Sequence, residues 1–216
     1  MANPTPRYNF DDRSGRYRDA KTGRFISPSV VTGALNDVIL SAAADMKAAS
    51  MALQSGNLTL AAWQLTMEQS IKNMHLASAA MAKGGWQNLT QADFGRIGAI
   101  VKREYGFLRT FANDIASGKQ ALNGSFLQRS QEYMRAGKVT YNEVLKRENE
   151  KRQMNYVRNV RHARDSCPLC IEQERLGWVK TDDSRLIPPG RRTCRGYCQC
   201  QWVFGTAQEA GIAEAA

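Results

Sequence analysis

Cys167-Pro-Leu-Cys170 and Cys194-Arg-Gly-Tyr-Cys198-Gln-Cys200 together contain every cysteine of the chain. Two cysteines separated by two residues can present both thiolates to one tetrahedral metal ion, and the second cluster follows after a loop of zinc-ribbon length. The spacing therefore predicts a structural Zn²⁺ site whose ligands come from Cys167, Cys170, Cys194, Cys198 and Cys200.

A disulfide framework and free thiols are the alternatives to zinc. The N-terminus lacks the basic segment, apolar stretch and cleavage site of a secretory signal peptide, and five cysteines cannot all pair. A catalytic zinc needs an open position and usually His or carboxylate ligands, and the nearest histidine in the sequence is His162. We expect a closed structural site and a solvated His162 at a helix end.

The choice of four ligands from five cysteines stays open at this point. Cys167 and Cys170 form the firm pair, because a two-residue spacer is the usual chelating arrangement. If Cys198-Gln-Cys200 is extended, its two thiols share a face, since strand side chains alternate, and Cys194 is then spare. The opposite choice uses Cys194 and only one of the last pair.

The charge of the chain indicates an acidic partner or environment. Thirty Lys and Arg residues against 20 Asp and Glu give a formal charge of +10, which favours contact with nucleic acid, an anionic protein surface or a membrane face. The alternative is a basic surface that only keeps the protein soluble. No apolar run is long enough to span a bilayer, so we expect no membrane partner.

Apolar residues recur at spacings of three and four from Thr32 to His162, which predicts a mainly α fold. Short Gly-containing connections favour an antiparallel helical bundle. The expected helices lie near 33–55, 58–83, 91–117, 125–136 and 141–163. The expected organisation is an N-terminal arm at 1–28, a helical body at 29–163, a Cys-rich zinc module at 164–205 and a flexible tail at 206–216.

The second expected helix carries Met67, Met74 and Met81 one heptad apart. Such a stripe is more often a packing surface between helices than a cofactor site, because methionine fills irregular gaps. His75 lies beside the stripe, and we expect it at the edge of the helix.

Two capping boxes are expected, because a Thr followed three residues later by an acidic residue marks a helix start. One is Thr90 with Asp93, and the other is Thr140 with Glu143. The second follows Gly137, which we expect to end the preceding short helix.

The arm contains a hairpin signal. Arg16–Asp19 and Arg24–Ser27 flank a turn that ends at Gly23, and Asp19 is a favourable turn residue. A hairpin of two strands is marginal alone in water. We therefore expect the arm to dock on a neighbouring subunit, the alternative being a loosely ordered tail, with Asn3–Pro6 extended. The expected docking residues are Tyr17, Arg18, Arg24 and Phe25, with Tyr17 and Phe25 paired across the strands.

Most of the excess charge lies between Arg135 and Arg164, where nine Lys and Arg residues face three Glu residues. The periodicity places this segment on one long helix that ends near His162. Such a run is either a solvated face or a surface that contacts nucleic acid or an acidic protein. The candidate contacts are Lys146, Arg147, Lys151, Arg152, Arg158 and Arg161.

Signatures of common enzymes are missing from the sequence. There is no GxSxG, Walker or HExxH motif, and the two histidines form no supported pair with a cysteine nucleophile. An HNH-type nuclease would need catalytic His and Asn residues around the cysteines. We expect no catalytic residues and no enzymatic activity.

The run Asp165–Cys170, followed by Gly177-Trp178, Pro189-Gly190 and Cys198-Gln-Cys200 before Trp202, resembles the C-terminal metal-binding end of Mu-type minor head proteins of tailed phages. These are also called head morphogenesis proteins. Many of them have a His-Pro ahead of the final Cys-x-Cys, whereas Cys194 occupies that region here. Segments 92–98 and 103–108 resemble helices of phage structural proteins encoded near the portal.

The resemblance implies a non-enzymatic virion component, made in the host cytoplasm, that acts in head assembly. Its implied partners are portal or major capsid proteins, with packaged DNA as a further candidate, and it would be present in several copies in a symmetric assembly. The alternative is a zinc-containing nucleic-acid-binding or regulatory protein, for which the basic segment next to the cysteines is the argument.

Overall fold

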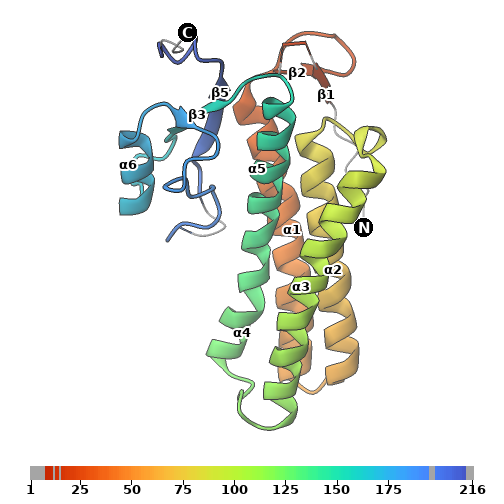
Figure 1. Cartoon of the computed structure of the whole chain (residues 1–216). Coiled ribbons are helices and arrows are strands. Elements are labelled where there is room, and N and C mark those ends of the chain that lie inside the picture. The colour runs from red at the N-terminus through yellow and green to blue at the C-terminus, as the bar shows by residue number, and fades with distance from the viewer. Residues whose placement is uncertain (1–7, 12, 15, 195–197, 213–216) are drawn as a thin grey trace.

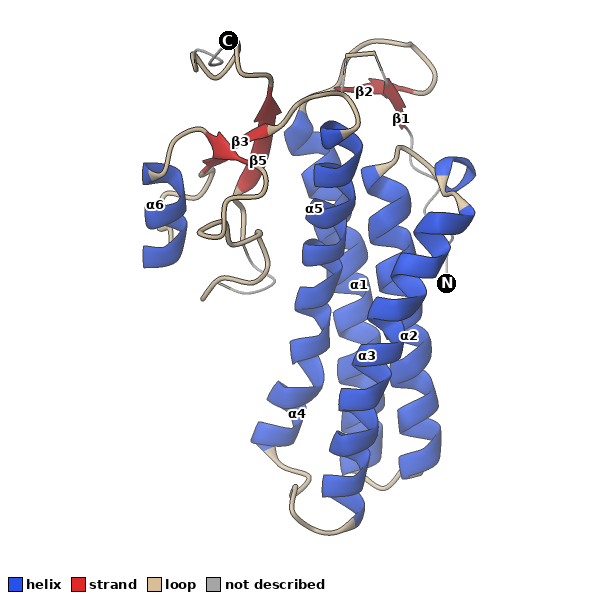
Figure 2. Ribbon diagram, viewed as in Figure 1, coloured by secondary structure: helices blue, strands red, loops and turns tan. Residues whose placement is uncertain are grey.

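The computed structural model describes residues 8–11, 13–14, 16–194 and 198–212 (Figure 1). The fold is mainly helical, as predicted, and it also contains two small sheets among the described residues whose strand pairings the sequence did not predict (Figure 2). The expected extended segment at 3–6 lies outside the described residues. The helices are α1 (Pro28–Gln54), α2 (Leu60–Ala82), α3 (Gln91–Ala116), α4 (Gly124–Gln131), α5 (Arg135–Glu150) and α6 (Pro168–Arg175), with short 3-10 turns at Trp86–Asn88 and Glu132–Met134.

The long helices α1, α2, α3 and α5 lie side by side, and α4 continues the line of α5 (Figures 1 and 2). Their interior is filled by two apolar clusters. One surrounds Leu35 and Met74 at the end near the N-terminal arm, and the other surrounds Trp63, Phe111 and Phe126 at the far end. The three aromatic rings of the second cluster contact one another, with ring centroids 5.3 to 5.7 Å apart, so this end of the helical body is closely packed.

Several local predictions for the helices are confirmed. Met67, Met74 and Met81 are all buried along α2, as a packing stripe requires. Thr90 and Asp93 form the expected capping box at the start of α3. The box is reinforced from α2, because Lys83 Nζ donates a hydrogen bond of 2.7 Å to Asp93 Oδ2 in a buried ion pair.

The predicted boundaries after Gln131 are wrong. The expected break at Gly137 is absent, and α5 continues through it. A Cβ atom at this position would lie 2.9 Å from Met74 Cγ, so the glycine permits close approach of α5 to α2. The helix then ends at Glu150 instead of reaching residue 163. Gln153 adopts a left-handed φ of 62°, and the chain enters strand β3 (Tyr156–Val160).

The predicted second capping box is also wrong, because Thr140 lies inside α5. Its hydroxyl is 2.7 Å from Nδ1 of His75 on α2. His75 is completely buried and does not lie at the helix edge. Among the described residues, its hydrogen-bonding neighbour is this hydroxyl on another helix, a contact between residues far apart in the sequence.

The arm packs on its own helical body. Strand β1 (Tyr8–Asp11) pairs with β2 (Arg16–Asp19), and β2 makes one further bridge, between Arg18 and Phe25. The expected Tyr17–Phe25 pair is therefore wrong by one residue. Tyr17 is buried and its hydroxyl donates a 2.9 Å hydrogen bond to the Ala82 carbonyl at the end of α2.

The other expected docking residues of the arm are more accessible. Arg18 is ion-paired with Asp11, whereas Arg24 and Phe25 are exposed. Docking on a partner thus stays a prediction for Arg24 and Phe25, while Tyr17 is already occupied within the chain.

Candidate metal centre

The Cys-rich module is built on a small antiparallel sheet next to α5 (Figure 1). Its strand order is β4 (Val179–Lys180), β3 and β5 (Gln201–Gly205). Val157, Val179 and Trp202 form its apolar core. Helix α6, which begins at the first cysteine pair, packs against β3, and Cys200 directly precedes β5, so both groups of cysteines lie beside this sheet.

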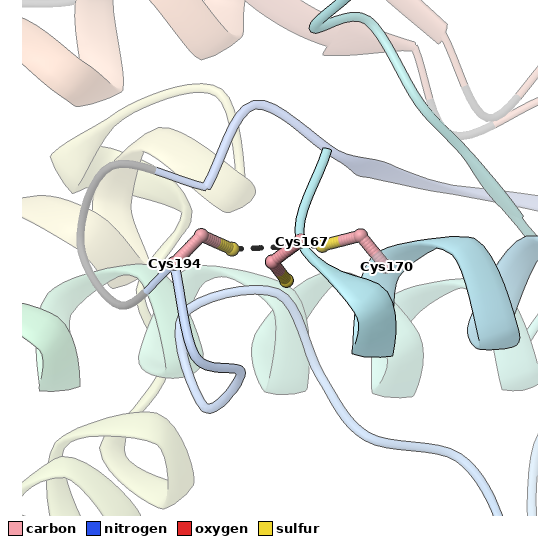
Figure 3. Close-up of side chains that lie close together, drawn as sticks. All are labelled: Cys167, Cys170 and Cys194. Atoms are coloured by element: carbon pink, nitrogen blue, oxygen red, sulfur yellow. Dashed lines mark hydrogen bonds between the residues drawn. The ribbon is translucent and has the colours of Figure 1, made fainter. Parts of the chain in front are cut away.

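The first cysteine pair lies at the start of α6. Cys167 is the residue that caps the helix, and the following Pro168 suits the first helical turn, where no backbone donor is needed. The Cys170 N–H donates a 2.9 Å hydrogen bond to the Cys167 carbonyl, which folds the intervening residues into a tight turn. The turn and the loop bring the thiols of Cys167, Cys170 and Cys194 close together (Figure 3).

All five cysteines gather at one place. The sulfur atoms form two trios, within each of which every pair is at most 4.8 Å apart, and Cys170 belongs to both. One trio adds Cys167 and Cys194 to it, and the other adds Cys198 and Cys200. The cysteines are buried or half-buried, so the cluster could hold a metal ion away from solvent.

The separations between the sulfur atoms fit metal ligation better than a disulfide. Cys170 Sγ lies 3.5 Å from Cys194 Sγ and 3.8 Å from Cys198 Sγ. Zinc–sulfur bonds of about 2.3 Å in a tetrahedron place the sulfurs roughly 3.8 Å apart, whereas a disulfide requires about 2.05 Å. Cys170 therefore has two neighbours at distances suited to a shared cation.

The final Cys-x-Cys alternates as the sequence predicts. Cys198 and Cys200 are buried and Gln199 between them is exposed, so both thiols face inward. Cys194 lies in the same cluster, so both choices of four ligands that the sequence left open remain open in the structure. Cys200 also lines a cavity of about 270 Å³ between the arm, α1, α5 and β5.

Two buried cations flank the thiols. Arg192 is 2% exposed, and its Nη1 donates to Asn159 Oδ1 at 2.7 Å and contacts Cys170 Sγ at 3.6 Å. Lys138 of α5 is 1% exposed, and its Nζ donates to the Cys198 carbonyl and to Asn36 Oδ1. Neither cation has a carboxylate partner among the described residues.

Such buried charges are costly without an anion nearby. Thiolates supply that anion, so the two cations fit a cluster that carries negative charge. Neither residue could be identified from the sequence, since an Arg beside another Arg and a Lys within a basic segment both resemble solvated surface.

The acidities of the thiols differ strongly. Hydrogen bonding from Cys200, against the effect of burial, lowers the pKa of Cys198 to about 4. Burial raises the pKa of Cys194, and the neighbouring Cys198 thiolate raises it further. The pKa of Cys200 is raised first by its hydrogen bond with Cys198 and then by burial. The thiols therefore cannot all ionise without an added positive charge among them.

The Cys-rich module also contacts the helical body through α1 and α5. Gln201 Nε2 donates a 2.7 Å hydrogen bond to Thr32 Oγ1 of α1. Gly190 adopts a φ of 98°, and a Cβ there would lie 3.0 Å from Lys138 Cβ and 3.2 Å from the Arg135 carbonyl oxygen of α5. The loop that delivers Cys194 is therefore held directly against α5.

The six candidate contacts for nucleic acid do not share one helix face. They are spread over α5, the turn after it, β3 and the residue that follows β3. Several are engaged within the chain: Lys146 with Glu150, Lys151 with Glu148, Arg161 with Glu174, Arg152 over the Phe10 ring and Arg158 over the Trp178 ring. Arg147 is half-buried and forms no ion pair among the described residues. His162 is exposed, but it follows β3 and does not end a helix.

No protein-family model, curated protein or solved structure matches this chain. In the described part of the chain, none of the helices combines the length and apolarity needed to cross a bilayer.

Proposed function

We propose that the cysteine cluster binds one structural Zn²⁺ and that the chain is a non-enzymatic assembly protein of a tailed-phage head. The observation that carries the zinc proposal is the gathering of five thiols around Cys170 at ligand-like separations. Thiolate-rich tetrahedral sites select zinc and leave no open position for substrate. Arg192 and Lys138 would balance the negative charge of a zinc ion bound by four thiolates.

The role of the metal would be to stabilise the Cys-rich module and to hold it on the helical body. The module has a small apolar core, and its loops carry the ligands, so zinc would supply much of its stability. Because Cys198 and the loop at Gly190 are in contact with α5, the same metal would also fix the module on the helical body.

The proposed place of the protein is the portal vertex, on portal or major capsid proteins. Support comes from the resemblance of the Asp165–Trp202 pattern to Mu-type minor head proteins. Further support comes from exposed large apolar side chains on the arm and the helical body, which suit contacts with partner proteins. They are Phe25, Val30, Leu40, Met51, Leu65, Phe94 and Phe107.

The alternative, a nucleic-acid-binding zinc module, has weaker support. A phosphate-binding face needs accessible cations, and ion pairs already engage Lys146, Lys151 and Arg161. Binding of duplex DNA with a steep salt dependence would favour this alternative.

Mass spectrometry of purified, DNA-filled particles tests the proposed role. We expect the chain among the virion proteins and expect the Cys167→Ser variant to be lost from the particles. Absence of the natural chain from particles, in lysates that contain it, would reject the assembly role. Zinc binding by the purified chain would be unaffected by that outcome.

A further inference from the structure

A groove runs along the helical body between α3 and the α4–α5 pair. Helix α2 packs against both α3 and α5, but these two helices, described over their full lengths, make little direct contact with each other. The space between them forms two cavities of about 460 Å³ and 310 Å³, which share Glu104 and Glu132 in their walls. We name this continuous hollow the α3–α5 groove.

Each wall of the groove is one face of a helix. On α3 the lining residues are Ile100, Arg103, Glu104, Phe107 and Thr110, which recur at spacings of three and four. On the opposite wall they include Glu132, Ala136, Val139, Glu143 and Arg147. Two facing helical stripes of this kind form a surface into which a further helix can fit.

Unpaired guanidinium groups line the larger cavity. Arg103 comes from α3, Arg147 from α5 and Arg191 from the loop that leads to Cys194. None of the three is in an ion pair among the described residues, whereas Arg135 in the same wall is paired with Glu132. Free guanidinium groups bind carboxylates or phosphates through two parallel hydrogen bonds, so this end of the groove favours an anionic ligand.

The smaller cavity has a different character. Phe107 lies in its wall and is 58% exposed, which is unusual for a large aromatic side chain. Ala136 and Val139 add apolar surface in the larger cavity. The groove thus combines an aromatic contact near one end with free cations near the other.

The charges in the groove favour a peptide over a nucleic acid. Glu104, Glu132 and Glu143 lie among the arginines and would repel a continuous row of phosphates. A peptide can instead place single carboxylates against the arginines and apolar residues against Phe107. A second copy of this chain is disfavoured as the ligand by its own formal charge of +10.

We propose that the α3–α5 groove binds an acidic amphipathic helix of a partner protein. Its carboxylates contact Arg103, Arg147 and Arg191, and its apolar face covers Phe107. This inference specifies where on the helical body a partner docks. It rests on the proposed assembly role for the identity of that partner.

A synthetic fluorescein-labelled helical peptide, with glutamates one turn apart beside leucines, is the probe for this site. Fluorescence anisotropy with the full chain should show binding, and the same peptide with lysines in place of glutamates should not bind. Arg103→Glu and Arg147→Glu should each weaken binding about tenfold, because each places a negative charge against the peptide carboxylates. Arg109→Glu, on an exposed arginine of the same helix outside both cavities, is the matched control and should have little effect.

The aromatic contact has its own matched pair. Phe107→Ala should weaken peptide binding several-fold, whereas Phe94→Ala, on the same helix but outside the groove, should not. Equal losses in test and control variants, or no binding of the acidic peptide, would overturn the inference. Tighter binding of a single-stranded oligonucleotide that is lost in the same variants would also overturn it, in favour of a phosphate ligand.

The outcomes separate this inference from the proposed function. If the chain is present in purified particles but does not bind the peptide, the proposed assembly role is retained and the proposed binding site in the α3–α5 groove is rejected. If the chain binds the peptide through Arg103 and Arg147 but is absent from particles, the binding site is retained and the assembly role is rejected.

Discussion

Protonation of His75 should destabilise the fold as the pH falls below neutral. Burial, and to a lesser extent the charge of Arg103, lowers the pKa of His75 from its ordinary value of 6.5 to about 4. The unfolded chain therefore binds a proton at higher pH than the folded chain, and the stability contributed by neutral His75 is lost as the pH falls from 6.5 toward 4. These two values predict a loss of about 2 kcal/mol between pH 7.5 and pH 5, and about 3 kcal/mol in total.

Urea unfolding at both pH values, followed by circular dichroism, measures this loss. His75→Gln removes the titrating group, so its loss of stability between the two pH values should be about 2 kcal/mol smaller than that of the natural chain. Other titrations, including any release of metal by acid, are common to both proteins and cancel in the difference. His162→Gln alters an exposed histidine and should retain the full pH dependence. The same loss in His75→Gln as in the natural chain would refute the reasoning.

Three further predictions concern the arm, the metal centre and a helix cap. Gly84→Ala should destabilise the chain by at least about 1 kcal/mol more than Gly56→Ala, since both glycines have φ above 70° but only at Gly84 would a Cβ collide with the Phe10 backbone; equal urea midpoints would contradict this. Lys138→Met should weaken zinc retention against a chelator about tenfold, whereas Lys146→Met on the same helix should not; equal zinc release rates would be evidence against a role for the buried charge. Thr90→Ala should lower unfolding free energy by about 1 kcal/mol through loss of the cap, and an unchanged thermal midpoint would argue otherwise.

Local signals in the sequence were sufficient for the early helices. The methionine stripe of α2 and the Thr90–Asp93 box depend on neighbours three, four or seven residues away, so periodicity alone locates them. The alternating burial of Cys198, Gln199 and Cys200 is equally local, although these residues directly precede β5 and do not belong to it.

The errors arose where tertiary contacts override local preference. Gly137 looks like a helix end in the sequence, but the space for its missing Cβ is taken by Met74 of α2, a contact that no local pattern reveals. Thr140 resembles a cap and instead reaches His75. In β3, Val157 and Asn159 are buried and Arg158 between them is not, but the burial of a polar Asn cannot be read from the sequence, so this segment did not show the alternation of a strand.

The candidate site was predictable in its cysteines and not in its surroundings. Spacing identifies the five thiols as a group, but the contacts of Lys138 and Arg192 with that group depend on the packing of α5 and of the loop before Cys194. The sequence does not indicate that these two charged residues are buried, because Lys and Arg side chains are normally solvated.

Native mass spectrometry of the freshly purified chain tests the proposed metal centre most directly. We predict one zinc ion per chain, with four thiol protons displaced, and loss of that ion in Cys170→Ser, since Cys170 belongs to both sulfur trios. A metal-free chain purified from zinc-sufficient cells, or a mass two or four protons lower that indicates disulfides, would contradict it.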